Sequence, residues 1–215
     1  ASDVYKRQTL HNPDLGVDEL MKIMPGPDLP TGGEVIGVDG IRDYYVTGRG
    51  SFLTRARYEV EQLPRGRTKI SFFELPYMVS AESVLEKINQ IRVDRVREVT
   101  RNGKKHKETT KANPVVARNL SEAKDLSDKR HGLRFVVTTT KGGNYKALLN
   151  ELFNETDLQT SFSVNCTVIN QSVPQRISVL EMLRNFVDLR RGCTVARSRH
   201  RITQIDARLH RLDDG

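Results

Sequence analysis

The hydrophobic pattern between Thr68 and Ile169 changes period several times, and the order of these changes constrains the fold more than any other feature of the chain. Alternating or β-branched runs predict strands at 68–75, 114–126, 133–140 and 158–169. Apolar residues spaced three and four apart predict helices at 80–93 and 145–153. The resulting order βαββαβ is that of a ferredoxin-like plait, an α+β fold with a four-stranded antiparallel sheet and two helices on one face.

The segment that precedes this plait ends in a second β pattern. Residues 51–61 alternate between apolar and charged side chains, which predicts a strand with one buried face. Pro64, Arg65 and Gly66 then form a turn signal. We therefore expect a base segment at 9–67 that ends in a β-hairpin, followed by the plait at 68–170. Residues 1–8 follow no periodic pattern and are expected to be a non-native remnant.

The segment from 171 to 215 is predicted to be the start of a long helical arm. Ile202, Ile205, Leu209 and Leu212 lie alternately three and four residues apart, which is the spacing of a coiled-coil seam. Gly192 predicts a break between a shorter helix and this one, because glycine disfavours helix interiors.

The charge balance favours a polyanionic partner. The chain carries 35 Lys and Arg against 27 Asp and Glu, a net charge of +8, so nucleic acid ranks first and an acidic membrane surface second. No apolar run is long enough to predict a membrane-spanning helix. Seven Lys and Arg against two acids fall within 95–111, which we expect to be an exposed, mobile loop.

Neither cysteines nor histidines predict a metal site or a disulfide framework. Cys166 and Cys193 have no paired spacing, and the five histidines are scattered. Two Gly-rich runs, at 24–33 (MPGPDLPTGG) and 45–57 (YVTGRGSFLTRAR), also lack the spacing of a nucleotide-binding loop. Taken alone, each of these runs predicts a turn.

Further runs follow these two in a fixed order along the chain: FELPYMV at 73–79, LEKI at 85–88, LLNELF at 148–153, TDLQTSF at 156–162 and FVDLRR at 186–191. Together the runs resemble the breakage-reunion (A) subunit of bacterial type IIA DNA topoisomerases, the family of the DNA gyrase A subunit and its topoisomerase IV counterpart. The resemblance extends over most of residues 15–212. It departs from the family pattern in the longer, basic segment between Val93 and Pro114 and at Leu189, where the family commonly has His.

This resemblance implies that the chain is an internal part of such a protein, covering the tower and the start of the coiled coil. It implies an ATP-dependent holoenzyme of the cytoplasm that breaks, passes and rejoins double-stranded DNA. The implied partners are duplex DNA, a B subunit that holds ATP and Mg²⁺, and a second A subunit in an A2B2 assembly, with no membrane partner. No cofactor is expected to bind this segment itself.

The family nucleophile is a tyrosine preceded by arginine, and Arg57-Tyr58 is the only such pair in the chain. Tyr58 lies on the apolar side of the predicted strand, so we expect it to pack in the interior. The resemblance then implies that the catalytic tyrosine lies upstream of residue 9. On this reading the chain alone is inactive.

Five cations are the predicted DNA contacts. Arg49 lies between two glycines that allow a close approach of backbone, and Arg55 and Arg57 are expected to share one strand face; Lys69 and Lys141 are secondary candidates. The alternative for each is a solvated side chain or an ion pair with Glu59 or Glu61.

Two other functions compete with DNA binding by a topoisomerase tower. A ferredoxin-like RNA-binding module would need aromatic side chains on its exposed sheet face, whereas Phe72 and Phe73 are predicted to point to opposite faces. A dimerising scaffold would act mainly through its terminal helix, and the seam described above allows this.

Overall fold

The computed structural model describes residues 12, 16–101, 104–130, 132–170 and 172–213. The chain forms two compact units that interleave along the sequence. The sheet unit comprises 28–37 and 52–162, and the helical unit comprises 1–27, 38–51 and 163–215. The predicted remnant at 1–8 lies outside the described residues, and the predicted boundaries at 67/68 and 170/171 stay predictions.

The sheet unit is built on a four-stranded antiparallel sheet with the order β3-β4-β8-β7. Its strands are β3 (Arg57–Leu63), β4 (Arg67–Glu74), β8 (Phe135–Thr139) and β7 (Leu120–Asp125). A tight turn at Pro64–Gly66 joins β3 to β4, as the turn signal predicts. The alternation of buried and exposed residues along β4 shows that one face of the sheet meets the core.

Helices α4 (Ala81–Arg92), α5 (Pro114–Asn119) and α6 (Tyr145–Glu155) supply the other half of this core. Each begins at a side chain that accepts hydrogen bonds from the first free amides: Ser80 for α4, Asn113 for α5 and Asn144 for α6. The core contains fully buried aliphatic and aromatic side chains from both layers, among them Ile70, Phe72, Val84, Ile88, Phe135, Leu148 and Leu152. Removing this apolar surface from water is the main stabilising contribution to the unit.

The predicted α+β class, with antiparallel sheets and a long C-terminal helix, is confirmed, but the strands are distributed differently. The segment predicted as one strand at 158–169 divides into β9 (Gln159–Asn165) and β10 (Thr167–Asn170), and neither belongs to the four-stranded sheet. The edge beside β4 is taken by β3 instead. A three-residue turn makes this pairing local, so its loop-closure cost is small.

A second sheet contains β1 (Glu34–Ile36), β2 (Arg49–Arg55) and β9, in the order β1-β2-β9. The strand predicted at 51–61 is therefore two strands, β2 and β3, which separate at Ala56. A register shift between Arg57 and Tyr58 marks the start of the pairing of β3 with β4. Ala56 is buried, and its amide donates to the carbonyl oxygen of Leu158 at 2.8 Å, which holds the break in place.

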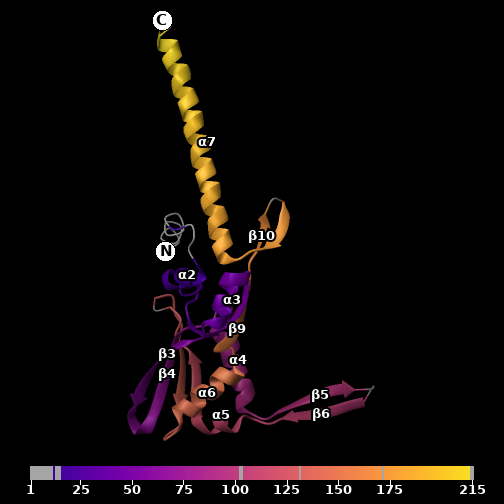
Figure 1. The fold of residues 1–215 in the computed structure, drawn as a ribbon. Coiled ribbons are helices and arrows are strands. Elements are labelled where there is room, and N and C mark those ends of the chain that lie inside the picture. Colours follow the sequence, from indigo (N-terminus) through magenta and orange to yellow (C-terminus); the bar gives the residue numbers. More distant parts are fainter. Residues whose placement is uncertain (1–11, 13–15, 102–103, 131, 171, 214–215) are drawn as a thin grey trace. The chain divides into compact units, whose positions relative to one another are not determined.

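Two predictions between the helices are wrong. The segment 114–126 is not one strand but α5 followed by β7, because Asn113 caps the helix and Pro114 suits its first position. The segment 95–111 is not a loop. It forms an antiparallel hairpin of β5 (Arg95–Arg101) and β6 (Lys104–Thr110), which projects from the sheet unit in Figure 1. The pair Arg101↔Lys104 leaves an Asn-Gly dipeptide as the connection, the strongest short hairpin signal.

The helical unit contains α2 (Val17–Ile23), α3 (Asp39–Thr47), the hairpin of β10 with β11 (Val173–Arg176), and α7 (Val179–Asp213). Leu20, Ile41 and Tyr45 are buried, and the Tyr45 hydroxyl donates to the carbonyl oxygen of Met24 at 3.0 Å. Helix α7 runs unbroken for 35 residues, so the predicted break at Gly192 is wrong. One interior glycine costs about 1 kcal/mol, which a helix of this length tolerates. No helix among the described residues is long and apolar enough to cross a membrane.

Candidate nucleic-acid interface

Arg49 lies at a hollow of the helical unit where two arginines and three hydroxyl groups meet. The hollow is lined by Asp43, Thr47, Arg49, Gly50, Ser51, Ser163 and Arg176. Both guanidinium groups belong to exposed residues, and neither has an ion-pair partner among the residues that the structure describes. Guanidinium and hydroxyl groups are donors that contact phosphate oxygens in protein–DNA complexes.

The backbone around Arg49 is held in a fixed position. The Thr47 hydroxyl donates to the carbonyl oxygen of Asp43 at 2.7 Å and accepts from the amide of Arg49 at 3.2 Å. A Cβ atom at Gly50 would lie 2.0 Å from the carbonyl oxygen of Gly40, so only glycine fits there. The close backbone approach predicted at this Gly-Arg-Gly run is therefore between Gly50 and the backbone of Gly40 in the same chain.

Arg55 is held within the sheet unit. Its Nε and a terminal guanidinium nitrogen donate to Oε1 of Gln159 at 2.8 and 2.5 Å. Its Cζ also lies 4.5 Å from the centre of the Phe153 ring, a cation–π contact on the helix-covered side of the sheet. These contacts occupy much of the guanidinium.

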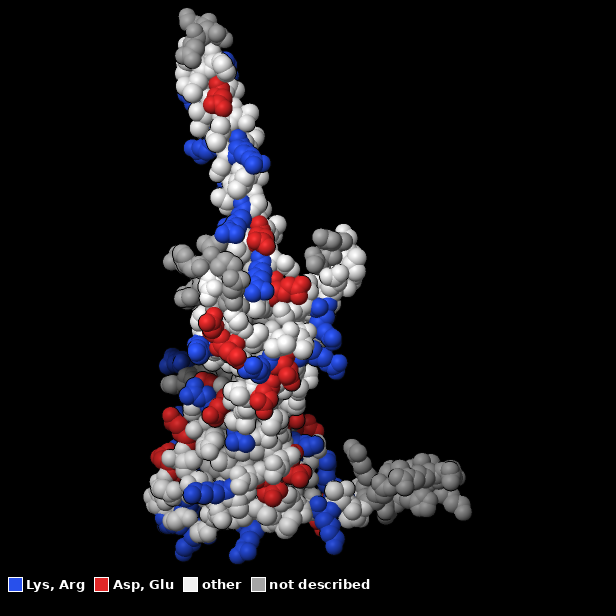
Figure 2. Space-filling view, in the orientation of Figure 1, with Lys and Arg blue, Asp and Glu red and all other residues white. Residues whose placement is uncertain are grey.

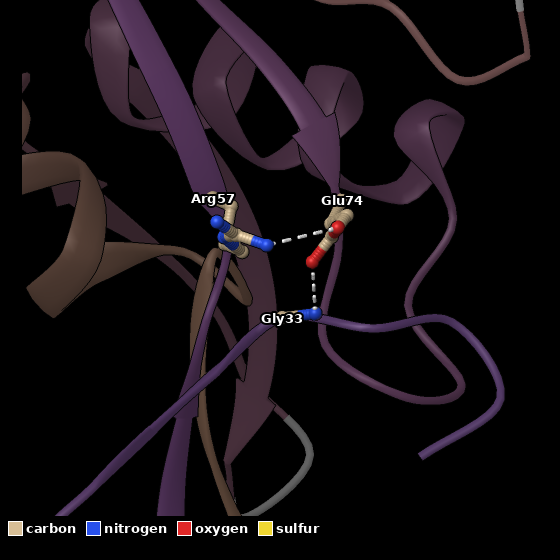
Figure 3. Close-up of polar contacts among 3 residues, drawn as sticks. All are labelled: Gly33, Arg57 and Glu74. Carbon is tan, nitrogen blue, oxygen red and sulfur yellow. Dashed lines mark hydrogen bonds and ion pairs between the residues drawn. The ribbon is translucent and has the colours of Figure 1, made fainter. Parts of the chain in front are cut away.

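Arg57 points to a different face from Arg55. Its Cζ lies 5.6 Å from the centre of the ring of Phe73, which is on the open side of β4, opposite Phe72. Its guanidinium pairs with Oε1 of Glu74 at 3.3 Å (Figure 3). The break at Ala56 explains why the two arginines do not share the strand face that an unbroken strand predicts.

Glu74 joins Arg57 to the Gly-rich loop. Its other oxygen, Oε2, accepts from the amide of Gly33 at 2.6 Å, as Figure 3 shows. Gly32 has φ +73°, and a Cβ there would lie 2.6 Å from the same oxygen. The runs at 24–33 and 73–79 therefore meet through one carboxylate. Sequence reasoning missed this role of Glu74 and named Glu59 and Glu61 as the acidic partners instead.

The two lysine candidates differ in their surroundings. Lys69 pairs with Glu61, and this hydrogen bond and the lysine charge lower the pKa of the Glu61 carboxyl. Lys141 is exposed in the turn between β8 and α6, with no hydrogen-bond or ion-pair partner for its ammonium among the described residues. Lys141 is therefore free to bind an anion, whereas Lys69 is partly neutralised.

Comparisons with known proteins show the family of the chain. The family model of the DNA gyrase/topoisomerase IV A subunit matches residues 4–214. The chain belongs to this family. The A subunit of DNA gyrase from Leptospira biflexa is 33% identical over 204 residues, and that from Halalkalibacterium halodurans is 34% identical over 202. The A subunit of DNA topoisomerase 4 from Streptococcus pneumoniae is 32% identical over 201 residues.

These matches cover 94–95% of this chain but 22% of each relative, so the chain spans about a fifth of the length of these relatives. Gyrase and topoisomerase IV relatives match it to a similar degree. The two Gly-rich runs that carry the resemblance lie in the structure at the Glu74 contact and at the Arg49 hollow.

The structure places Tyr58 of the Arg-Tyr pair in aromatic contacts and gives no cluster of metal ligands among the described residues. Tyr58 packs against Phe72 and Phe153, with ring centres 5.9 Å away in each case, which agrees with a packing role. Its expected place in the interior is wrong, because Tyr58 is 37% exposed on the edge strand β3. Burial raises the pKa of the Cys166 thiol, which disfavours the reactive thiolate. Among the described residues, no three His, Cys, Asp or Glu side chains lie close enough together to hold a metal ion.

Proposed function

We propose that this chain is the duplex-binding tower of a type IIA topoisomerase A subunit, and that it supports and bends the DNA that the holoenzyme cuts. Membership of the family, the net charge of +8 and the Arg49 hollow support the proposal. The hollow is the observation that carries it, because it brings together two exposed guanidinium groups that have no ion-pair partner among the described residues.

The proposal assigns the remaining chemistry to other parts of the assembly. Strand cleavage belongs to a tyrosine outside residues 9–215, and ATP and Mg²⁺ belong to the B subunit of an A2B2 complex in the cytoplasm. This chain contributes binding free energy that offsets the cost of bending the duplex. Bending a site of about 20–30 bp costs on the order of 1–6 kcal/mol, which phosphate contacts from Lys and Arg offset.

The salt dependence of duplex binding tests this assignment. Each phosphate contact contributes about 0.9 to the slope of log K against log salt, so Arg49→Gln with Arg176→Gln lowers the slope by up to about 1.8. The control is Lys22→Gln with Arg42→Gln in the same unit, which removes the same charge from an exposed lysine and from an arginine already paired with Asp18. The proposal is wrong if the unaltered chain shows no salt-dependent duplex binding. Equal losses in both variants would remove Arg49 and Arg176 as contacts.

Helix α7 supports dimerisation as a second function of the same chain. Val195, Ile202, Ile205, Leu209 and Leu212 repeat at heptad spacing, and their exposed fractions lie between 48% and 69%. Exposed aliphatic side chains at this spacing are typical of a helix that pairs with another copy. Sedimentation equilibrium tests this, and a monomer at high concentration would contradict it.

A further inference from the structure

We propose that one end of the four-stranded sheet is a second phosphate-binding surface for duplex DNA, separate from the Arg49 hollow. This surface, the basic end, consists of Arg65, Arg67, Arg118, Lys141 and Lys146. The inference rests on the proposed function, since it assigns a further contact to the same nucleic-acid partner.

Hydrogen bonds bring the three segments of the basic end together. The amide of Gly142 donates to the carbonyl oxygen of Gly66 at 2.8 Å, which joins the β3–β4 turn to the β8–α6 loop. The amide of Thr140 donates to the carbonyl oxygen of Asn119 at 2.8 Å, and the Thr140 hydroxyl donates to the carbonyl oxygen of Arg118 at 3.0 Å. These bonds join the end of α5 to the same loop. Arg118 and Lys141 line one open hollow.

The cations of the basic end are exposed and lack acidic partners. All five residues are exposed, and none has an ion pair among the described residues. The segments 62–68, 114–121 and 139–147 contain no Asp or Glu. Nearby carboxylates are engaged elsewhere: Glu61 pairs with Lys69, and Glu122 pairs with Lys124. In Figure 2, blue side chains gather along the lower edge of the sheet unit.

Backbone amides do not explain this surface. Asn144 already accepts from the amides of Lys146 and Ala147, both at 3.1 Å, so these two amides at the start of α6 are satisfied within the chain. The side chains of the basic end are therefore the groups that we assign to phosphate. Flexible Lys and Arg side chains without base-reading partners are suited to the phosphate backbone and carry no sequence preference.

The β5–β6 hairpin is also rich in Lys and Arg. It leaves the sheet unit between α4 and α5, where the amide of Asn113 donates to the carbonyl oxygen of Ile91 at 2.8 Å. Its strands pair only with each other, and residues 95–110 include six Lys and Arg against two Glu. A two-stranded ribbon fits the major groove of duplex DNA, so the hairpin adds an element of basic composition to the same unit.

The test compares two triple variants with equal net charge. Arg67→Gln, Arg118→Gln and Lys141→Gln neutralise the basic end, while Lys87→Gln, Lys129→Gln and Arg130→Gln neutralise exposed cations on α4 and in the β7–β8 turn at the opposite end of the sheet. Fluorescence anisotropy with a duplex of about 30 bp measures affinity at several salt concentrations. Matching thermal midpoints establish that both variants are folded.

The basic-end variant should lower the log–log salt slope by up to about 2.7 and weaken binding on the order of a hundredfold at about 0.15 M salt. The opposite-end variant should bind as the unaltered chain does. Equal slopes for both variants overturn the inference and leave the proposed function intact. An unaltered chain that fails to bind duplex, or that prefers a single strand of equal length or anionic phospholipid vesicles, overturns both.

Discussion

Replacing Glu74 by alanine should destabilise the sheet unit through one named contact. The carboxylate accepts from the amide of Gly33 at 2.6 Å and pairs with Arg57 at 3.3 Å. A hydrogen bond to a charged acceptor contributes about 1.5–3 kcal/mol, and an exposed ion pair about 0–1 kcal/mol. The Arg57 side chain is 55% exposed, so water replaces much of that pair. We therefore expect a loss of about 1.5–3 kcal/mol in the free energy of unfolding, most of it from Gly33.

Urea unfolding followed by far-UV circular dichroism measures this loss, and a double-mutant cycle divides it. Arg57→Ala alone should cost under about 1 kcal/mol, and the coupling between Arg57 and Glu74 should be of the same size. Glu86→Ala, at an exposed position of α4, is the control and should stay within about 0.5 kcal/mol of the unaltered chain. The reasoning is refuted if Glu74→Ala changes stability no more than this control, or if the Arg57 coupling accounts for the whole loss.

Three further outcomes follow from the same contacts. Gly32→Ala should destabilise the chain by about 1 kcal/mol or more, because φ is +73° and the new Cβ would meet Glu74; thermal unfolding of this variant with and without Glu74→Ala should show partial rescue. Arg55→Met should lower stability by about 1–2 kcal/mol while leaving the salt slope of duplex binding unchanged, since the guanidinium is already bound within the protein. The lowered pKa of Glu61 means that its pairing with Lys69 stabilises the fold at neutral pH and is lost as acid protonates the carboxyl; Glu61→Gln should therefore flatten the acid side of the stability–pH profile, and an unchanged profile would contradict this.

The site shows where reasoning from the sequence stops. Arg49, Arg55 and Arg57 were chosen for charge and spacing, and both criteria are local. The contact that occupies Arg55 comes from Gln159, 104 residues away, and the partner of Arg57 lies on the neighbouring strand. Sequence spacing does not predict either partner, because the side chains that face each other across two strands depend on the pairing register.

The hairpin at 95–110 shows the opposite case. Its composition resembles that of a solvated loop, and its Asn-Gly dipeptide is the local signal for a two-residue turn. The charge content favours a loop, whereas the Asn-Gly dipeptide favours a hairpin. The structure has the hairpin, in which Arg101 pairs with Lys104.

The sequence by itself determined the class of the fold, the family, and the elements β4, α4, β8 and α6 of the sheet unit to within a few residues. These depend on periodicity, capping side chains and ordered motifs, all of which act over short stretches of chain. Only the tertiary structure decided which strand borders β4, that Glu74 joins two distant motifs, and that the segments with Arg118 and Lys141 meet at one end of the sheet. Those outcomes depend on pairing between distant segments, where many registers compete and packing selects one.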